Sequence, residues 1–141
     1  MDANNLLIEK NILITGASSG IGKSLSLNLS KFGANVIMLS KNEKALDSVY
    51  DEIKEKYNTQ PMIIKCDLSH LDEDKSQEIS NIIAENYSKL DAIIHNAAIL
   101  EKMSNIENYD LITWEKVLKV NLTSVFILSK YLIPLMKSAL V

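Results

Sequence analysis

Short apolar runs alternate along the chain with longer stretches in which apolar residues recur every three or four positions. The short runs predict buried strands, and the longer stretches predict amphipathic helices that connect them. Strands interleaved with helices in this way are typical of a parallel sheet covered by helices, the α/β class of fold. We expect the strands at Asn11–Thr15, Asn35–Ser40, Met62–Lys65 and Ala92–His95.

A helical stretch follows each predicted strand. The first is expected to end at Gly33, because glycine is common just after the last helical residue. The later helices are expected over residues 43–57, 72–87 and 113–137, and Pro134 is expected to bend or end the last of them. The inward face of the first helix is predicted to consist of Ile21, Leu25, Leu29 and Phe32.

The order of the strands follows from the handedness of their connections. Right-handed crossovers give the order 3-2-1-4, with a crevice between the first and fourth strands. Ligands of such sheets bind in this crevice, at the carboxyl ends of the strands. The 141 residues suffice for one domain, an incomplete doubly wound, Rossmann-type sheet with flanking helices.

The turn after the first strand contains three of the four glycines, Gly16, Gly20 and Gly22. Gly16 permits a tight turn, Gly20 lets the backbone approach a phosphate, and Gly22 lets the helix pack on the strand. The N–H groups of the first helical turn would then face an anion such as a pyrophosphate. Spaced glycines alone equally fit a plain turn with a helix cap. The strand before them and the helix after them favour the phosphate site.

The run from Thr15 to Gly22, Thr-Gly-Ala-Ser-Ser-Gly-Ile-Gly, resembles the short-chain dehydrogenase/reductase family, whose glycines have this spacing. The resemblance implies a nicotinamide dinucleotide cofactor. It also implies hydride transfer between that cofactor and a small-molecule carbonyl or secondary alcohol substrate. The residues expected to hold the pyrophosphate are Gly16, Ser18, Ser19, Gly20, Ile21 and Gly22.

The second strand leads into Ser40 and Lys41, where the adenosine ribose should lie. An acidic residue there would accept a hydrogen bond from a 2′-hydroxyl and favour NAD, but the chain has none. Lys41 can pair with a 2′-phosphate, and it resembles the arginine of NADP-preferring family members as a point charge without the fork. We therefore expect NADP to be preferred over NAD. The alternative is a solvated lysine at a strand end.

Two segments resemble the family at the ends of the later strands. Asp67, with Leu68 beside it, resembles the aspartate that accepts a hydrogen bond from the adenine amino group, although it could instead cap the next turn. Asn96, Ala97 and Ala98 resemble the Asn-Ala-Gly segment, in which the asparagine braces the sheet and the small residues lie beneath the nicotinamide ribose. Ala98 stands where the family has glycine.

Asn121, on the last helix, resembles the family's helix asparagine, which holds a water molecule in the proton relay behind the catalytic lysine. The alternative is an asparagine satisfied by the backbone of its own helix. His95 has no visible carboxylate or nucleophile partner and is expected to pack at a strand end. Cys66 is expected to be a small buried residue.

Beyond this asparagine the family has a strand with a serine and a helix with Tyr-x-x-x-Lys. After Asn121 the chain has one tyrosine, Tyr131, and residue 135 is leucine. Tyr50 and Lys54 have the right spacing but lie on the helix after the second strand, where Tyr50 is expected to pack in the core. The chain is therefore expected to be the cofactor-binding N-terminal portion of such an enzyme, cut off before the Ser/Tyr/Lys segment and inactive alone.

The composition argues against nucleic acid as a partner and indicates the cellular compartment. The net charge is −3 and all 15 basic residues are lysine, so no nucleic-acid surface is expected. One cysteine and no visible secretory signal favour the cytoplasm. The apolar stretch Leu122–Val141 is interrupted by Lys130 and Lys137 and is expected to be a poor membrane span. No cluster of metal ligands is predicted.

The last helix carries more apolar residues than one neighbouring face is expected to cover. Such a helix beside an open sheet edge favours association, and the resemblance implies a homo-oligomer formed through the last helices. An isolated product is expected to be oligomeric or poorly soluble. The positions expected to lack full cover are Val117, Val120, Val125, Ile127, Leu128 and Leu132.

Two alternatives to an NADP-dependent oxidoreductase remain. A non-catalytic dinucleotide-binding or interaction module would also bind the cofactor, so only turnover separates it from the enzyme. A methyltransferase with a similar glycine loop would explain Thr15–Gly22 but gives no reason for Asp67, Asn96 or Asn121. The sequence does not indicate the substrate.

Overall fold

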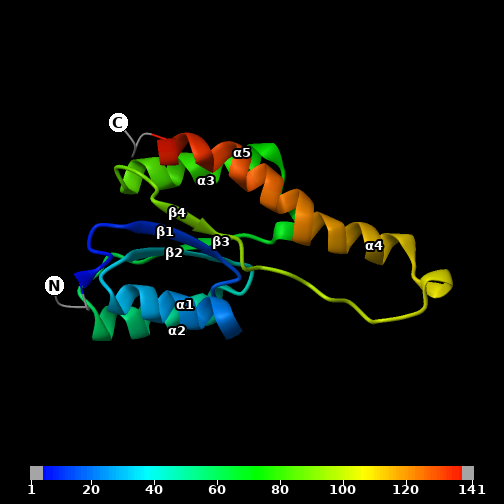
Figure 1. Cartoon of the computed structure of the whole chain (residues 1–141), viewed down its shortest axis with the longest axis horizontal. Coiled ribbons are helices and arrows are strands. Elements are labelled where there is room, and N and C mark those ends of the chain that lie inside the picture. The colour runs from blue at the N-terminus through cyan, green and yellow to red at the C-terminus, as the bar shows by residue number, and fades with distance from the viewer. Residues whose placement is uncertain (1–4, 138–141) are drawn as a thin grey trace.

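The computed structural model describes residues 5–137 of the chain. A parallel sheet of four strands lies between two layers of helices (Figure 1). The strand order is β3-β2-β1-β4, as predicted, so the first strand of the chain is paired on both sides. The strands are β1 (Asn11–Thr15), β2 (Asn35–Ser40), β3 (Met62–Lys65) and β4 (Ala92–Ile94).

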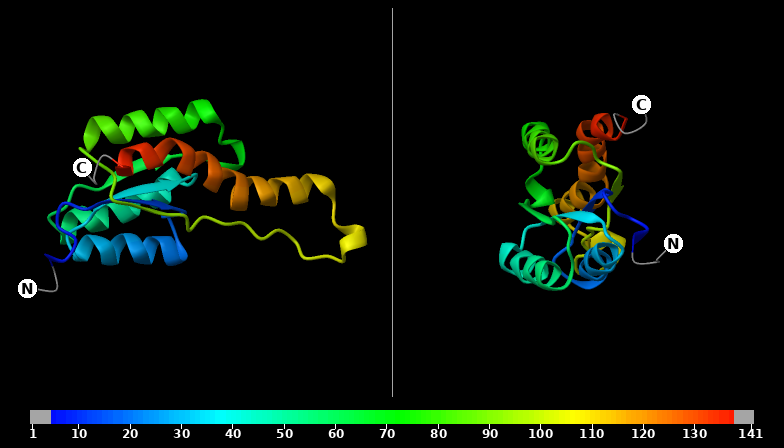
Figure 2. Two further views of the ribbon diagram at one scale, coloured as in Figure 1. Left: turned by 45° about the horizontal axis from the view of Figure 1, so that its top comes forward. Right: turned by 90° about the vertical axis from the view of Figure 1, so that its left-hand side faces the viewer.

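Helices α1 and α2 cover one face of the sheet, and α3 and α5 cover the other (Figures 1 and 2). A π-helical turn, Lys119–Thr123, joins α4 to α5, so the last helix is continuous, and Pro134 lies inside it without ending it. Helix α4 and the segment before it extend beyond the sheet (Figure 1). The helices are α1 (Gly20–Lys31), α2 (Glu43–Lys56), α3 (Glu73–Asn86), α4 (Leu111–Leu118) and α5 (Ser124–Lys137).

Alternate side chains of the strands enter two separate cores, as strand geometry requires. Leu13 of β1 packs with residues of α3 and α5, whereas Ile12 and Ile14 pack with residues of α1 and α2. The helical residues buried with Leu13 include Ile79, Ile83, Ile127, Leu128 and Leu132. Those buried with Ile12 and Ile14 include Leu46, Val49 and Ile53.

Helix α1 meets the sheet through small residues, and the inward face predicted for it is wrong in part. Gly22, Ser26 and Ser30 are buried, whereas Ile21, which its spacing placed inward, is 72% exposed. Small side chains let the helix approach the sheet closely. The Ser26 hydroxyl donates to the Gly22 carbonyl at 2.8 Å, so that it is buried without needing a partner outside the helix.

A row of polar groups crosses the amino ends of the strands. The Asn11 side chain accepts from the Asn35 amide and donates to the Lys89 carbonyl, both at 2.9 Å. The Asn35 oxygen accepts the Gln60 N–H, and the Asp91 carboxylate accepts the Asn11 N–H, again at 2.9 Å. Although burial opposes ionisation, this N–H and two nearby lysines hold the pKa of Asp91 below its ordinary value. The row ties together the beginnings of all four strands.

The last helix finds more cover than predicted. Of the six residues expected to lack it, four are buried, Val120, Ile127, Leu128 and Leu132, because α3 shares the face of the sheet with α5. Other large apolar side chains are exposed instead: Leu111, Ile112, Trp114, Leu118, Leu122, Phe126 and Ile133. Within the described residues, Leu111–Lys137 is the one helix long and apolar enough to cross a membrane, a test that a core helix also passes.

Candidate functional site

A cleft of about 770 Å³ opens at the carboxyl ends of the strands, where the crevice was predicted. Segments that follow all four strands contribute to its lining. Of the predicted site residues, Gly22 and Asn121 lie outside this lining. Those that line the cleft are Gly16, Ser18, Ser19, Gly20, Ile21, Ser40, Lys41, Asp67, Leu68, Asn96, Ala97 and Ala98.

The turn between β1 and α1 has the backbone that its glycines allow. Gly16 and Gly20 have positive φ, +66° and +52°, in the region where other residues are strained. A Cβ at Gly20 would meet no atom of residues 5–137 within 4 Å, so this part of the turn faces open space among the described residues. The Ser19 side chain caps no N–H of α1, and the first turn of that helix holds no acidic residue. The Ser19 side chain thus leaves the backbone N–H groups of this first turn uncapped, and such N–H groups suit the binding of a phosphate group.

Gly22 has a packing role in the same turn. A Cβ there would lie 2.1 Å from the Gly16 carbonyl oxygen and 2.7 Å from Nδ2 of Asn96. Asn96 donates to the Thr15 carbonyl at 3.0 Å, and the Thr15 hydroxyl accepts the N–H groups of Asn96 and Ala97 at 3.1 and 3.0 Å. These bonds tie the segment after β4 to the end of β1, as the predicted brace requires.

Polar groups gather beside this turn at the end of β2. The hydroxyl oxygens of Ser18 and Ser40 are 2.8 Å apart, and the Ser40 hydroxyl accepts the Asn42 N–H at 3.4 Å. Lys41 is exposed and lines the same part of the cleft. Two hydroxyls and an ammonium group suit a phosphate.

Asp67 lines the cleft and also caps a turn. Its Oδ1 accepts the hydroxyl and the backbone N–H of Ser69 at 2.8 and 2.9 Å, at the start of a short 3-10 helix, Leu68–His70. These two bonds hold the pKa of Asp67 below its ordinary value, and the charge of Lys41 adds to the effect. The capping alternative is therefore observed, and the carboxylate reaches the cleft as well.

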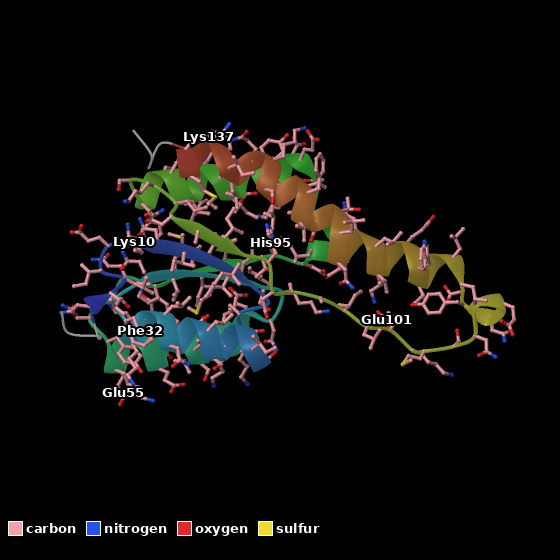
Figure 3. All side chains as sticks on the ribbon, in the orientation of Figure 1. Lys10, Phe32, Glu55, His95, Glu101 and Lys137 are labelled. Carbon is pink, nitrogen blue, oxygen red and sulfur yellow. The ribbon has the colours of Figure 1, made fainter. Side chains whose placement is uncertain are left out.

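Cys66 and His95 pack as predicted. Burial raises the pKa of the Cys66 thiol and lowers the pKa of the His95 imidazole. The His95 Nε2 lies 3.0 Å from the Ser129 hydroxyl of α5, which places the ring between the end of β4 and that helix (Figure 3). His95 does not line the cleft.

Asn121 lies in the π-helical turn, and its amide reaches the segment after β4. Its Nδ2 donates to the Ile99 carbonyl at 2.9 Å, and its Oδ1 accepts the Ile99 N–H at 2.8 Å. The alternative that its own helix satisfies this amide is therefore wrong. The role in a proton relay stays a prediction, whereas the observed contact positions the segment that carries Ala97 and Ala98.

An ion pair that the sequence does not predict lies at the edge of the cleft. The Lys116 Nζ on α4 lies 2.6 Å from Oε1 of Glu101, and both residues line the cleft. Fifteen residues separate them, so no local periodicity could pair them.

Tyr50 and Lys54, which have the spacing of Tyr-x-x-x-Lys, line a separate hollow of about 150 Å³ near the start of β3 and not the cleft.

Comparison with known proteins identifies the family. The family model of short chain dehydrogenase matches residues 10–140. The chain belongs to this family. The match excludes the methyltransferase alternative, because the dehydrogenase model covers nearly the whole chain.

The relatives of this short-chain dehydrogenase are longer than the chain. A protein of Escherichia coli K12 named uncharacterized oxidoreductase YciK is 35% identical over 94% of this chain and 52% of its own length. The 3-oxoacyl-(acyl-carrier-protein) reductase FabG of Rickettsia prowazekii is 36% identical over 88% of this chain and 47% of its own. The chain thus spans about half the length of the curated relatives that it matches.

Solved structures agree with this assignment. A short chain dehydrogenase from Pseudomonas syringae superposes with a TM-score of 0.92 at 31% identity, over 96% of this chain and 56% of its own. One from Escherichia coli CFT073, solved in complex with NADPH, gives a TM-score of 0.90 at 36% identity, over 94% of this chain and 55% of its own.

Proposed function

We propose that the chain is the NADP-binding portion of an oxidoreductase that transfers hydride between the nicotinamide and a carbonyl or secondary alcohol. One observation carries the proposal: the open glycine turn at the start of α1 adjoins the group formed by Ser18, Ser40 and Lys41. A pyrophosphate and a 2′-phosphate need these two features side by side. The relative solved with NADPH supports the choice of cofactor.

Different cleft residues would bind different parts of the cofactor. The first turn of α1 and Gly20 would hold the pyrophosphate, Lys41 the 2′-phosphate, and Asp67 the adenine amino group. Ala97 and Ala98 present only methyl groups, which leave room beneath the nicotinamide ribose. The nicotinamide ring of the bound cofactor supplies the chemistry, by accepting or donating the hydride.

Asn121 would act in this arrangement as a positioning residue, because both polar atoms of its amide bind Ile99. No Tyr-x-x-x-Lys follows it in the 141 residues, so we expect the chain alone to bind cofactor without turnover. The non-catalytic alternative shares this expectation. Turnover of a carbonyl substrate with NADPH by the whole protein distinguishes the two.

Calorimetric titration of the chain with NADPH and with NADH tests the proposal. We expect NADPH to bind more tightly, and Lys41→Gln to weaken NADPH binding about tenfold without changing NADH binding, since one charge-assisted hydrogen bond is lost. Lys44→Gln is the matched control, because Lys44 is exposed and does not line the cleft. NADH binding as tight as NADPH binding would contradict the preference, and no binding of either would contradict the function.

We also propose that a second copy of the chain covers the exposed apolar side of the last helix, where Leu118, Leu122 and Phe126 are between 37% and 65% exposed. Most soluble oligomers consist of identical subunits. Sedimentation velocity should therefore show a dimer or larger species, and a monomer at micromolar concentration would contradict this.

We also propose a cytoplasmic location, because the one cysteine fits a reducing compartment.

A further inference from the structure

Two contacts hold the extended segment after β4 against the last helix. Ile99 exchanges two hydrogen bonds with the Asn121 amide, at 2.8 and 2.9 Å. Two residues further along, Glu101 binds the Lys116 ammonium at 2.6 Å. Figure 3 shows Glu101 on this segment, beside the helix.

The spacing of the two contacts suits an extended chain that runs antiparallel to a helix. From Ile99 to Glu101 an extended chain advances about 6.6 Å. From Asn121 back to Lys116 a helix covers about 7.5 Å. The two lengths nearly match, so the amide contact and the ion pair can form together.

The ion pair also forms part of the cleft wall, and it lies near Asp67. Glu101 and Lys116 both line the cleft, together with Asp67 and Val120. The hydrogen bond and charge of Glu101 raise the pKa of Lys116, and the charge of Asp67 adds to the increase. Asp67 is the residue proposed to receive the adenine, so the ion pair belongs to that end of the cleft.

We propose that the Glu101–Lys116 ion pair is a clasp that closes the adenine end of the dinucleotide cleft. Together with the Asn121 contact, it holds residues 99–101 in place against the last helix, and these residues in turn form one wall for the adenosine. The clasp thus determines the affinity for the dinucleotide, because it fixes the position of this wall of the cleft. This inference rests on the proposed dinucleotide-binding function.

A direct effect of charge on the ligand makes a different prediction from the clasp. The dinucleotide is an anion, so removal of the Glu101 charge would strengthen its binding if charge alone acted, and removal of the Lys116 charge would weaken it. A clasp is broken equally by either substitution. Both Glu101→Gln and Lys116→Gln should therefore weaken binding, and the double variant should be no weaker than either single one.

The experiment is calorimetric titration of the 141-residue chain and its variants with adenosine 2′,5′-bisphosphate, which is the adenosine end of NADP. We expect each single variant to bind about two- to five-fold more weakly, the range for exposed ion pairs. Exchange of the charges, Glu101→Lys with Lys116→Glu, should restore affinity to within about twofold of wild type. Glu107→Gln and Lys102→Gln are the matched controls, because both are exposed charges between β4 and α4 that lie outside the cleft lining.

The outcomes are separable. Tighter binding by Glu101→Gln, or affinities of both variants equal to that of wild type, would overturn the clasp and leave the proposed function intact. Failure of the wild-type chain to bind the bisphosphate and NADPH would overturn the proposed function and the clasp together. Circular dichroism confirms that each variant is folded, and the exchanged pair tests the clasp even if a single variant is destabilised.

Discussion

Replacement of Gly22 by alanine tests how α1 is attached to the glycine turn. The new Cβ would lie 2.1 Å from the Gly16 carbonyl oxygen, where real contacts stay above 3.0 Å, so the backbone must yield by about 0.9 Å. The next atoms are the Gly16 carbonyl carbon and Nδ2 of Asn96, both at 2.7 Å, and Asn96 is itself bonded to Thr15. Two of these three atoms are backbone atoms, and the third belongs to a side chain that its hydrogen bond to Thr15 holds in place.

The expected loss follows from two opposing effects. Overpacking costs about 1–3 kcal/mol and sometimes more, and movement of backbone places this case near 4 kcal/mol. Alanine regains about 1 kcal/mol inside a helix. We therefore expect Gly22→Ala to lower the free energy of unfolding by about 3 kcal/mol, which corresponds to a fall in Tm of roughly 10 °C.

Urea unfolding followed by circular dichroism measures this loss, and two other glycines provide controls. Gly33 has φ +97° and lies far from the cleft, so Gly33→Ala should lose about 1–2 kcal/mol with dinucleotide affinity unchanged. Gly20→Ala should lose about 1 kcal/mol and bind dinucleotide more weakly, because the open space for phosphate is filled. A Gly22→Ala protein within about 0.5 kcal/mol of wild type would refute the steric reasoning.

Two further predictions concern His95 and Asn121. Burial keeps the folded-state pKa of His95 below its unfolded value, so its contribution to stability is present above about pH 6.5 and lost as the pH falls below that value. Unfolding between pH 7.5 and 5.5 should show a smaller decline for His95→Gln, and equal declines would contradict this. Asn121→Ala removes two exposed hydrogen bonds to Ile99, whose polar groups water can then reach, and should cost about 1 kcal/mol in urea unfolding, whereas a loss below about 0.3 kcal/mol would show that the segment does not need the amide.

Most of the sheet was predictable because strands buried on both faces appear as continuous apolar runs. The inward face of α1 was not, because the pattern assumes that the largest apolar side chains face the sheet. Where a helix lies close to strands, the size of a side chain and not its hydropathy decides whether it faces the sheet. Ser26 and Ser30 are therefore buried and Ile21 is exposed.

The cleft was predictable for a different reason. Its residues follow strand ends, and the ends of parallel strands meet at one edge of the sheet. The partner of Asn121 and the pairing of Glu101 with Lys116 could not be predicted in the same way. Asn121 lies in a π-helical turn, which adds a residue to one turn of the helix, and the sequence carries no periodic sign of that turn. Glu101 and Lys116 are 15 residues apart on different elements, so no local periodicity pairs them.

The central place of β1 has a consequence for synthesis of the protein. Asn11 bonds to Asn35, 24 residues later, on one side and to Asp91, 80 residues later, on the other. The longer closure costs only about 1 kcal/mol more in chain entropy. The second pairing is also delayed during synthesis, since at about 5–20 residues per second the ribosome needs roughly 4–16 seconds to make those 80 residues. During that interval one edge of the first strand is unpaired, so we expect the nascent chain to aggregate more readily than the finished protein.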